Sequence, residues 1–142
     1  MVMSWEACEK RYVRLTQRDV GKIESILEKV GDRIDIIESL DVNVKTVSFI
    51  VEGYCEAIKE LLVAYMLKDG LRSRNHQCMV SYFFLKNPEM KFQSILIENM
   101  SDFRNGLNYY GRGVPLGFYE ENVDEFKKII NFLFELLEVK DE

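Results

Sequence analysis

The chain has 142 residues, of which 47% are hydrophobic and 30% are charged, and its formal net charge is −5. This length and composition predict one globular domain over residues 1–142, exclude a disordered chain, and argue against strong non-specific binding to nucleic acids. No apolar run approaches the ~18 residues of a membrane span and residues 1–10 contain no hydrophobic signal region, so we expect a cytoplasmic protein with no membrane partner.

The first segment, residues 4–15, fits two local structures. Trp5, Cys8, Tyr12 and Leu15 recur at the spacing of a short helix. The pair Tyr12-Val13 with its basic neighbours also fits an extended arm. Both alternatives remain open from the sequence.

Basic residues gather in this first segment and again after the middle of the chain. Such a local patch permits a small RNA or nucleotide site, although a solvated charged face is the simpler explanation for any one of its members. The residues concerned are Lys10, Arg11, Arg14 and Arg18, with Arg72 and Arg74 elsewhere in the sequence.

The rest of the chain is organised in apolar stripes of helical period. Long helices are predicted over about 20–37, 45–68, from about 90 through the segment around 107, and from about 122 to 137. Thr16 is the expected N-cap of the first of these helices, and Gly70 is the expected stop of the second. A short helix over about 76–85 is predicted to begin at the cap residue Asn75, and residues 111–117 are predicted to form a loop.

No segment alternates convincingly with period two. The predicted fold is therefore an all-α antiparallel up-and-down bundle of four main helices plus short helices. Gly53 and Ala57 are small residues four apart on the second long helix, where they would let another helix approach closely. Phe132 and Phe134 make the last helix apolar on more than one side, which either a dimer surface or deep burial explains.

Cysteine and histidine are too sparse for the usual metal or triad chemistry. Cys8, Cys55 and Cys78 are far apart, no CxxC pair exists, and His76 is the only histidine. We therefore expect no metal site, no cofactor and no Ser-His-Asp triad. Reduced, mostly buried thiols in a reducing compartment are expected for the cysteines, and a structural role at a helix N-terminus is expected for His76.

The segment 102–112 concentrates polar and aromatic side chains at the end of a predicted helix. Arg104 and Asn105 precede Tyr109 and Tyr110 by one to two helical turns. Residues four and five apart lie on nearly the same helical face, so these side chains can face one pocket or one partner surface.

Several segments in this order resemble the archaeal proteins of the HEPN family, named for the higher-eukaryote and prokaryote nucleotide-binding domain. The resemblance covers roughly residues 4–137. The segments that carry it are residues 49–61, 69–73, 75–78 and 104–111, with the opening residues 5–8.

The resemblance implies a helical bundle that commonly forms homodimers with a polar cleft between the protomers. Many family members are metal-independent endoribonucleases, often toxins of a toxin–antitoxin pair that a cognate minimal nucleotidyltransferase neutralises. Others bind RNA or nucleotides without cleaving them. A homodimer with RNA or a nucleotide as ligand, and a minimal nucleotidyltransferase as partner, is therefore expected.

The family's catalytic signature is an arginine, usually followed by a polar residue, and a histidine that comes after four to six intervening residues. Arg104 and Asn105 match its first two positions, but Tyr109 and Tyr110 stand where the histidine is expected. Tyrosine, with an ordinary pKa near 10, is a poor proton shuttle at neutral pH. An arginine still binds phosphate, and tyrosines still stack on bases.

The resemblance thus implies RNA or nucleotide binding at Arg104, Asn105, Tyr109 and Tyr110, without cleavage. The alternatives are an endoribonuclease with Arg104 as catalytic residue, and a structural interaction partner. By position, Tyr109 and Tyr110 are also candidates for modification with adenosine monophosphate. The alternatives to a ligand site are a helix-end cap with an internal salt bridge for Arg104 and Asn105, and packing at a helix end or dimer interface for the tyrosines. The supporting polar residues are Asp102, Glu52 and Glu56.

Overall fold

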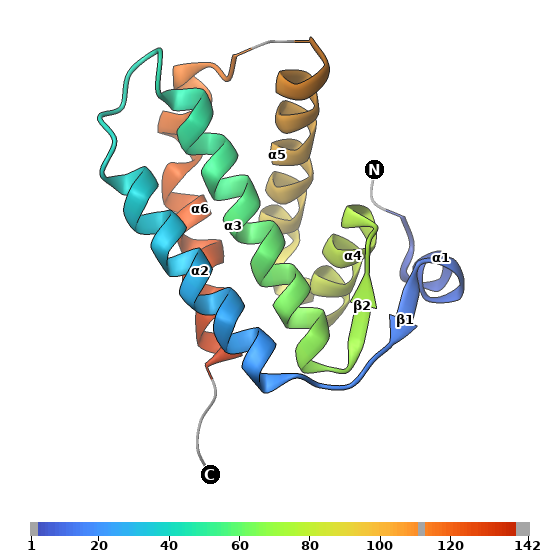
Figure 1. Ribbon diagram of the computed structural model, residues 1–142. Helices are drawn as coiled ribbons and strands as arrows, with labels where there is room; N and C mark the ends of the chain where they lie inside the picture. Colours follow the sequence, from blue (N-terminus) through green and yellow to red (C-terminus); the bar gives the residue numbers. More distant parts are fainter. Residues whose placement is uncertain (1–2, 111–112, 139–142) are drawn as a thin grey trace.

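The computed structural model describes the backbone of residues 3–110 and 113–138, and their side chains except those of 101–110. It confirms the predicted all-α bundle of four main helices plus short helices, to which it adds one small sheet (Figure 1). The elements in chain order are α1 (Trp5–Arg11), β1 (Val13–Leu15), α2 (Val20–Glu38), α3 (Val47–Lys68), β2 (Leu71–Ser73), α4 (His76–Lys86), the 3-10 helix η1 (Pro88–Met90), α5 (Lys91–Tyr110) and α6 (Leu116–Leu137).

Helix α3 is the centre of the bundle. It packs against α2, α4, α5 and α6, and Figure 1 shows it running between them. Its buried residues surround the helix, whereas α2 buries only the stripe formed by Ile23, Val30 and Ile37. Buried side chains of all four long helices join one hydrophobic core. No helix within the described ranges is long and apolar enough to cross a membrane.

The contact between α2 and α3 depends on Gly53. A Cβ atom at this position would lie 2.6 Å from Cγ2 of Ile37, which is closer than real carbon atoms approach. The glycine therefore lets α2 pack directly on the backbone of α3. This confirms the prediction that small residues on the second long helix permit close approach of a neighbour.

The sequence predicted two helix N-caps and one helix stop, and two of these three predictions are correct. Gly70 follows α3 with a φ of 73°, a conformation that costs glycine little. Asn75 caps α4 by accepting a hydrogen bond from the backbone N–H of Cys78 at 3.2 Å. The expected cap Thr16 is wrong: Asp19 caps α2, because its Oδ1 accepts a bond from the N–H of Lys22 at 3.0 Å.

The last helix begins earlier than its apolar stripe predicted. Helix α6 starts at Leu116 instead of near Asn122, so the C-terminal part of the predicted loop is helical. Pro115 precedes its first residue in an extended conformation and cannot itself donate the N–H that an earlier helix position would require. Phe118 and Tyr119 in this additional turn pack against the core, which stabilises it.

The first segment contains both of the structures that its sequence allowed. Residues 5–11 form a helix and residues 13–15 a strand, which pairs antiparallel with β2. The pairing continues in the hydrogen bond from the N–H of Thr16 to the carbonyl of Gly70, at 2.9 Å. Strands of three residues are too short to show a period of two in the sequence, which is why this sheet was not predicted.

A disulfide bond joins α1 to α4. Cys8 and Cys78 form it, both side chains are fully buried, and their Cα atoms are 5.5 Å apart. The expectation of reduced thiols is therefore wrong for these two cysteines, while Cys55 is half-buried and takes no part in this disulfide. The reducing compartment was inferred from reduced thiols, so the disulfide removes that argument for it.

Aromatic packing accompanies the disulfide. Trp5 on α1 lies 5.0 Å from the ring of Tyr82 on α4, measured between ring centroids. The Tyr82 hydroxyl donates a hydrogen bond to Asp69 at 2.6 Å. Burial of the ring is the largest cause, and this hydrogen bond the second, of a pKa of Tyr82 above its usual value. The hydroxyl therefore keeps its proton. Helix α1 and strand β1 are thus fixed to the end of the bundle.

Candidate functional site

The predicted site at the end of α5 is described only in its backbone. Helix α5 continues to Tyr110, so Arg104, Asn105, Tyr109 and Tyr110 all belong to this helix, as expected. Their side chains, and that of Asp102, lie outside the described part of the structure. The pairing of Arg104 with an acidic residue of α3 is therefore still a prediction.

The acidic residues proposed to support this site are described, and they share a face of α3. Glu52 and Glu56 are one turn apart and half-buried. Between them, Cys55 lies against α5, with its Sγ 3.6 Å from the carbonyl oxygen of Met100. Because α5 runs antiparallel to α3, its continuation beyond Met100 passes toward the turn of α3 that carries Glu52 (Figure 1). The backbone therefore brings the two predicted parts of the site to the same side of α3.

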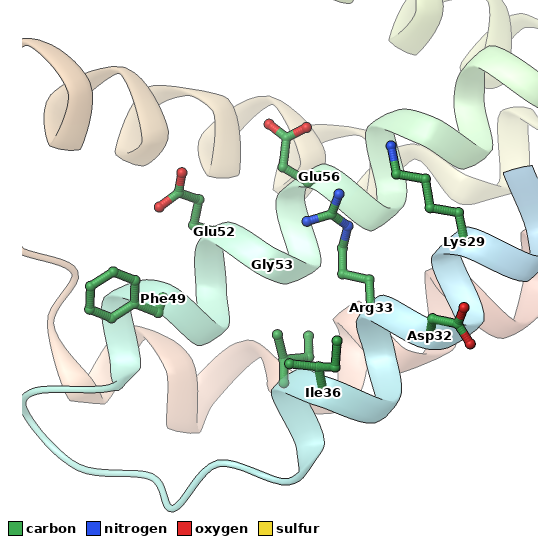
Figure 2. Close-up of a pocket in the computed structure, with 9 residues that line it drawn as sticks. Lys29, Asp32, Arg33, Ile36, Phe49, Glu52, Gly53 and Glu56 are labelled. Atoms are coloured by element: carbon green, nitrogen blue, oxygen red, sulfur yellow. The ribbon is translucent and has the colours of Figure 1, made fainter.

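Glu52 and Glu56 also line a groove between α2 and α3, which we call the mixed-charge groove (Figure 2). Its volume is about 590 Å³. The cations on its α2 side, Lys29 and Arg33, lie 3.7 Å and 2.9 Å from Oε1 of Glu60. Since these cations already have an internal carboxylate partner and three further acids line the groove, it is poorly suited to a phosphate. Its lining residues are Lys29, Asp32, Arg33, Ile36, Ile37, Phe49, Glu52, Gly53 and Glu56.

A group of positive charges lies elsewhere in the described structure, at the two-stranded sheet formed by β1 and β2. A pocket of about 580 Å³ there has five cationic side chains and no acidic one in its lining. We call it the basic pocket. Its lining residues are Arg11, Tyr12, Arg14, Lys22, Val63, Arg72, Ser73, Arg74 and Asn75.

The register of the two-stranded sheet explains why the arginines converge. Arg14 and Arg72 are direct partners across the two strands, so their side chains leave the same face of the sheet. Arg74 follows two residues after Arg72 and continues that face. Val13 and Leu71, which alternate with the arginines, pack against the hydrophobic core on the other face. The arginines therefore leave the outward face, while on the opposite face Val13 and Leu71 pack against the core and Leu15, at the end of β1, is 85% exposed.

These cations are not neutralised within the protein. Arg11, Arg14, Lys22, Arg72 and Arg74 are all exposed, and none forms an ion pair with a residue that the structure describes. Like charges directly opposite each other in a sheet destabilise it, by roughly 0.2–1 kcal/mol for a cross-strand pair. An anion held between the two guanidinium groups would remove this repulsion, since planar arginine forks bind phosphate oxygens in pairs.

One aromatic side chain belongs to the basic pocket. Tyr12 follows the last residue of α1, and 41% of its surface is exposed. It precedes Arg14 by two residues, which places it beside the arginine-bearing face of the sheet. An exposed ring next to cationic side chains is an arrangement on which a nucleic-acid base can stack.

The sequence identified part of this pocket but not its assembly. Arg11, Arg14, Arg72 and Arg74, members of the predicted basic patch, do come together, and Arg18 lies in the adjoining groove at the start of α2. Lys10 does not line the pocket, and Lys22 was missed. Lys22 gave no signal, because a lysine in the first turn of an amphipathic helix is typical of ordinary solvent exposure.

Within the described ranges, no group of three or more His, Cys, Asp or Glu side chains is arranged to hold a metal ion. His76 is the first residue of α4, as expected, and half-buried. Comparison with protein-family models, with curated proteins and with solved structures gave no match for this chain.

Proposed function

We propose that this protein binds single-stranded RNA and that the phosphates of the RNA occupy the basic pocket. The observation that carries the proposal is the cross-strand pair Arg14–Arg72, exposed and without an ion-pair partner in the described structure. Arg11, Arg74 and Lys22 extend the positive charge beyond what one phosphate needs. A chain of phosphates matches this extended charge better than a single anion does.

Charge and aromatic content both favour a single strand. The protein is acidic overall, with a net charge of −5, so repulsion restricts a polyanion to the positive pocket. Tyr12 offers its ring beside that pocket, and only the bases of an unpaired strand are free to stack on it.

The resemblance to HEPN proteins supports the same class of ligand. We propose that the chain is a HEPN-like protein that forms a homodimer and works with a minimal nucleotidyltransferase. In this proposal Arg104, Asn105, Tyr109 and Tyr110 form a second RNA contact, with Glu52 and Glu56 orienting Arg104. The replacement of the signature histidine by tyrosine favours binding over cleavage.

Binding of a fluorescently labelled single-stranded RNA tests the site. The variant Arg14→Ala/Arg72→Ala should bind at least about tenfold more weakly, since each charge-assisted bond that it removes contributes about 1.5–3 kcal/mol at most sites. Lys127→Ala/Lys128→Ala is the matched control, because it removes the same charge from exposed positions of α6. The variant Arg14→Ala/Arg72→Ala should fold at least as stably as the natural protein, because it loses a repulsive pair.

Equal RNA binding by Arg14→Ala/Arg72→Ala and by the control variant would overturn the proposed site. The same samples, examined for RNA length on a gel beside an Arg104→Ala variant, separate the alternatives. Cutting that Arg104→Ala abolishes would identify the endoribonuclease of toxin type. Neither binding nor cutting by the natural protein would leave the structural interaction partner.

A further inference from the structure

The basic pocket is built across a joint between the first segment (residues 4–15) and the rest of the protein. Arg11, Tyr12 and Arg14 reach the pocket from α1 and β1, whereas its other lining residues come from α2, α3, β2 and the residues that follow β2. Cys8 precedes Arg11 by three residues and is covalently bound to Cys78 of α4. The disulfide therefore holds one half of the pocket against the other.

Few contacts besides the disulfide hold the first segment in place. Cys8 is the only buried residue of α1, and β1 has no buried residue. The main further contacts are the packing of Trp5 on Tyr82, the partial burial of Val13, and a ladder of three residue pairs between β1 and β2. A helix of seven residues and a two-stranded sheet are each marginal in water on their own. The two arginines paired across the sheet also repel each other, which weakens the ladder.

The hydrophobic core is complete without the first segment. Its buried members run from Ile23 to Leu137, and all of them follow β1 in the sequence. Trp5 and Val13 pack against this core but are only half-buried. In Figure 1, α1 and β1 lie outside the group of four long helices. Detachment of the first segment would therefore leave the bundle of α2 to α6 folded.

We propose that the Cys8–Cys78 disulfide is a redox switch for the basic pocket. A dithiol reduces the disulfide, the first segment leaves β2 and α4, and the pocket loses Arg11, Tyr12 and Arg14. The release follows from the contacts of the first segment alone, whereas the resulting loss of RNA binding rests on the proposed function.

The chemistry of the switch is thiol–disulfide exchange. A thiolate of the dithiol attacks one sulfur of the disulfide and displaces the other, which takes up a proton. The second thiol of the reductant then attacks the mixed disulfide and displaces the remaining cysteine. Two electrons and two protons pass to the protein, which gains two cysteine thiols, and the dithiol becomes a cyclic disulfide. An oxidised dithiol reverses these steps.

The position of the disulfide links reduction to the opening of the first segment. Cys8 and Cys78 are fully buried, so a dithiol reaches their sulfur atoms only when the segment has opened. Residues 9–19 separate Cys8 from the first residue of α2. In the opened protein the intact disulfide closes these residues into a loop, which lowers the open fraction by about a hundredfold in the chain-entropy description. Reduction removes this restriction.

Comparison of the oxidised and reduced forms of Cys55→Ala, which keeps only Cys8 and Cys78, tests the switch. The two forms are prepared in oxidised and reduced dithiothreitol, and their thiols are counted by alkylation and mass spectrometry. Trp5 is the only tryptophan of the chain, so its emission maximum should move to longer wavelength when reduction releases the first segment. Backbone amides of β1 should exchange with solvent about a hundredfold faster after reduction, while those of α6 stay protected.

Binding of labelled single-stranded RNA is measured on the same samples. Its affinity should fall by about tenfold on reduction, since only the closed segment completes the pocket. Reoxidation should restore the affinity. The variant Cys8→Ala/Cys78→Ala should match the reduced form and should not respond to dithiothreitol. If this variant does not fold, the reversible comparison on Cys55→Ala still decides.

Three results would overturn the switch. The first is an exchange of the β1 amides that reduction leaves unchanged, and the second is a loss of protection in α6 equal to that in β1. The third is release of the first segment without any loss of RNA affinity. An oxidised protein that binds no RNA would count against the proposed function alone, because Trp5 emission and amide exchange report the release without RNA.

Discussion

Removing the disulfide between α1 and α4 should destabilise the protein strongly. Cys8 and Cys78 are separated by 70 residues in the sequence. Closing a loop of that length restricts the unfolded chain by about 4.4 kcal/mol at 25 °C in the chain-entropy description. With an unfolding entropy of about 2.1 cal/mol/K per residue, this corresponds to a fall in Tm of about 15 °C for a chain of 142 residues.

The substitution Cys8→Ala/Cys78→Ala, followed by urea and thermal unfolding, measures this loss. Cys55→Ala is the matched control, since Cys55 lies outside the disulfide and is only half-buried. A reductant should lower the Tm of the natural protein and of Cys55→Ala but not that of the double variant. The reasoning would be refuted by a double variant within about 1 kcal/mol of the control, or by a natural protein whose Tm does not respond to reductant.

Four further substitutions test the packing of α2 on α3, the turn after α3 and one buried ionisable group. Gly53→Ala should lower the free energy of unfolding by about 1–2 kcal/mol, because overpacking against Ile37 exceeds the helix-propensity gain. Gly31→Ala, with open space at its Cβ, should raise the free energy of unfolding by about 0.5–1 kcal/mol. Changes of the same sign for both variants in urea unfolding would contradict this packing of α2 on α3. Gly70→Ala should cost about 1 kcal/mol in the same assay, because φ is 73° there, and an unchanged midpoint would argue against the turn. Burial, then nearby acidic groups, raises the pKa of Tyr54 from 10.0 to about 12, so the folded state holds its proton more tightly than the unfolded state. Its contribution to stability is complete below pH 10 and is lost as the pH rises to about 12. Tyr54→Phe should therefore show a shallower decline of the unfolding free energy over this interval, and an unchanged slope would count against the shift.

The apolar periodicity of the sequence was sufficient to predict the long helices. In α2, Ile23, Val30 and Ile37 recur at the helical period and are the buried residues of that helix. Such a stripe is visible because one helix has one core-facing side, and its pattern is local in sequence. The early start of α6 was missed since its first turn is stabilised by contacts of Phe118 and Tyr119 with the core, which local spacing does not show.

The features that depend on distant segments were not predictable in the same way. The disulfide pairs two of three cysteines, and composition does not select a pair. The pairing of Arg14 with Arg72 requires the register of a two-stranded sheet whose strands have three residues each and are separated by two long helices in the sequence. The sequence shows the arginines as a basic group, but their convergence on one face is a property of the fold.

The measurement that tests the proposed function most directly is the salt dependence of single-stranded RNA binding. For single strands, the slope of log affinity against log salt changes by about 0.7 for each phosphate that the protein neutralises. Arg14→Ala/Arg72→Ala should therefore reduce the magnitude of the slope by about 1.4, while Lys127→Ala/Lys128→Ala should leave it unchanged. Equal slopes for the two variants would contradict phosphate binding in the basic pocket.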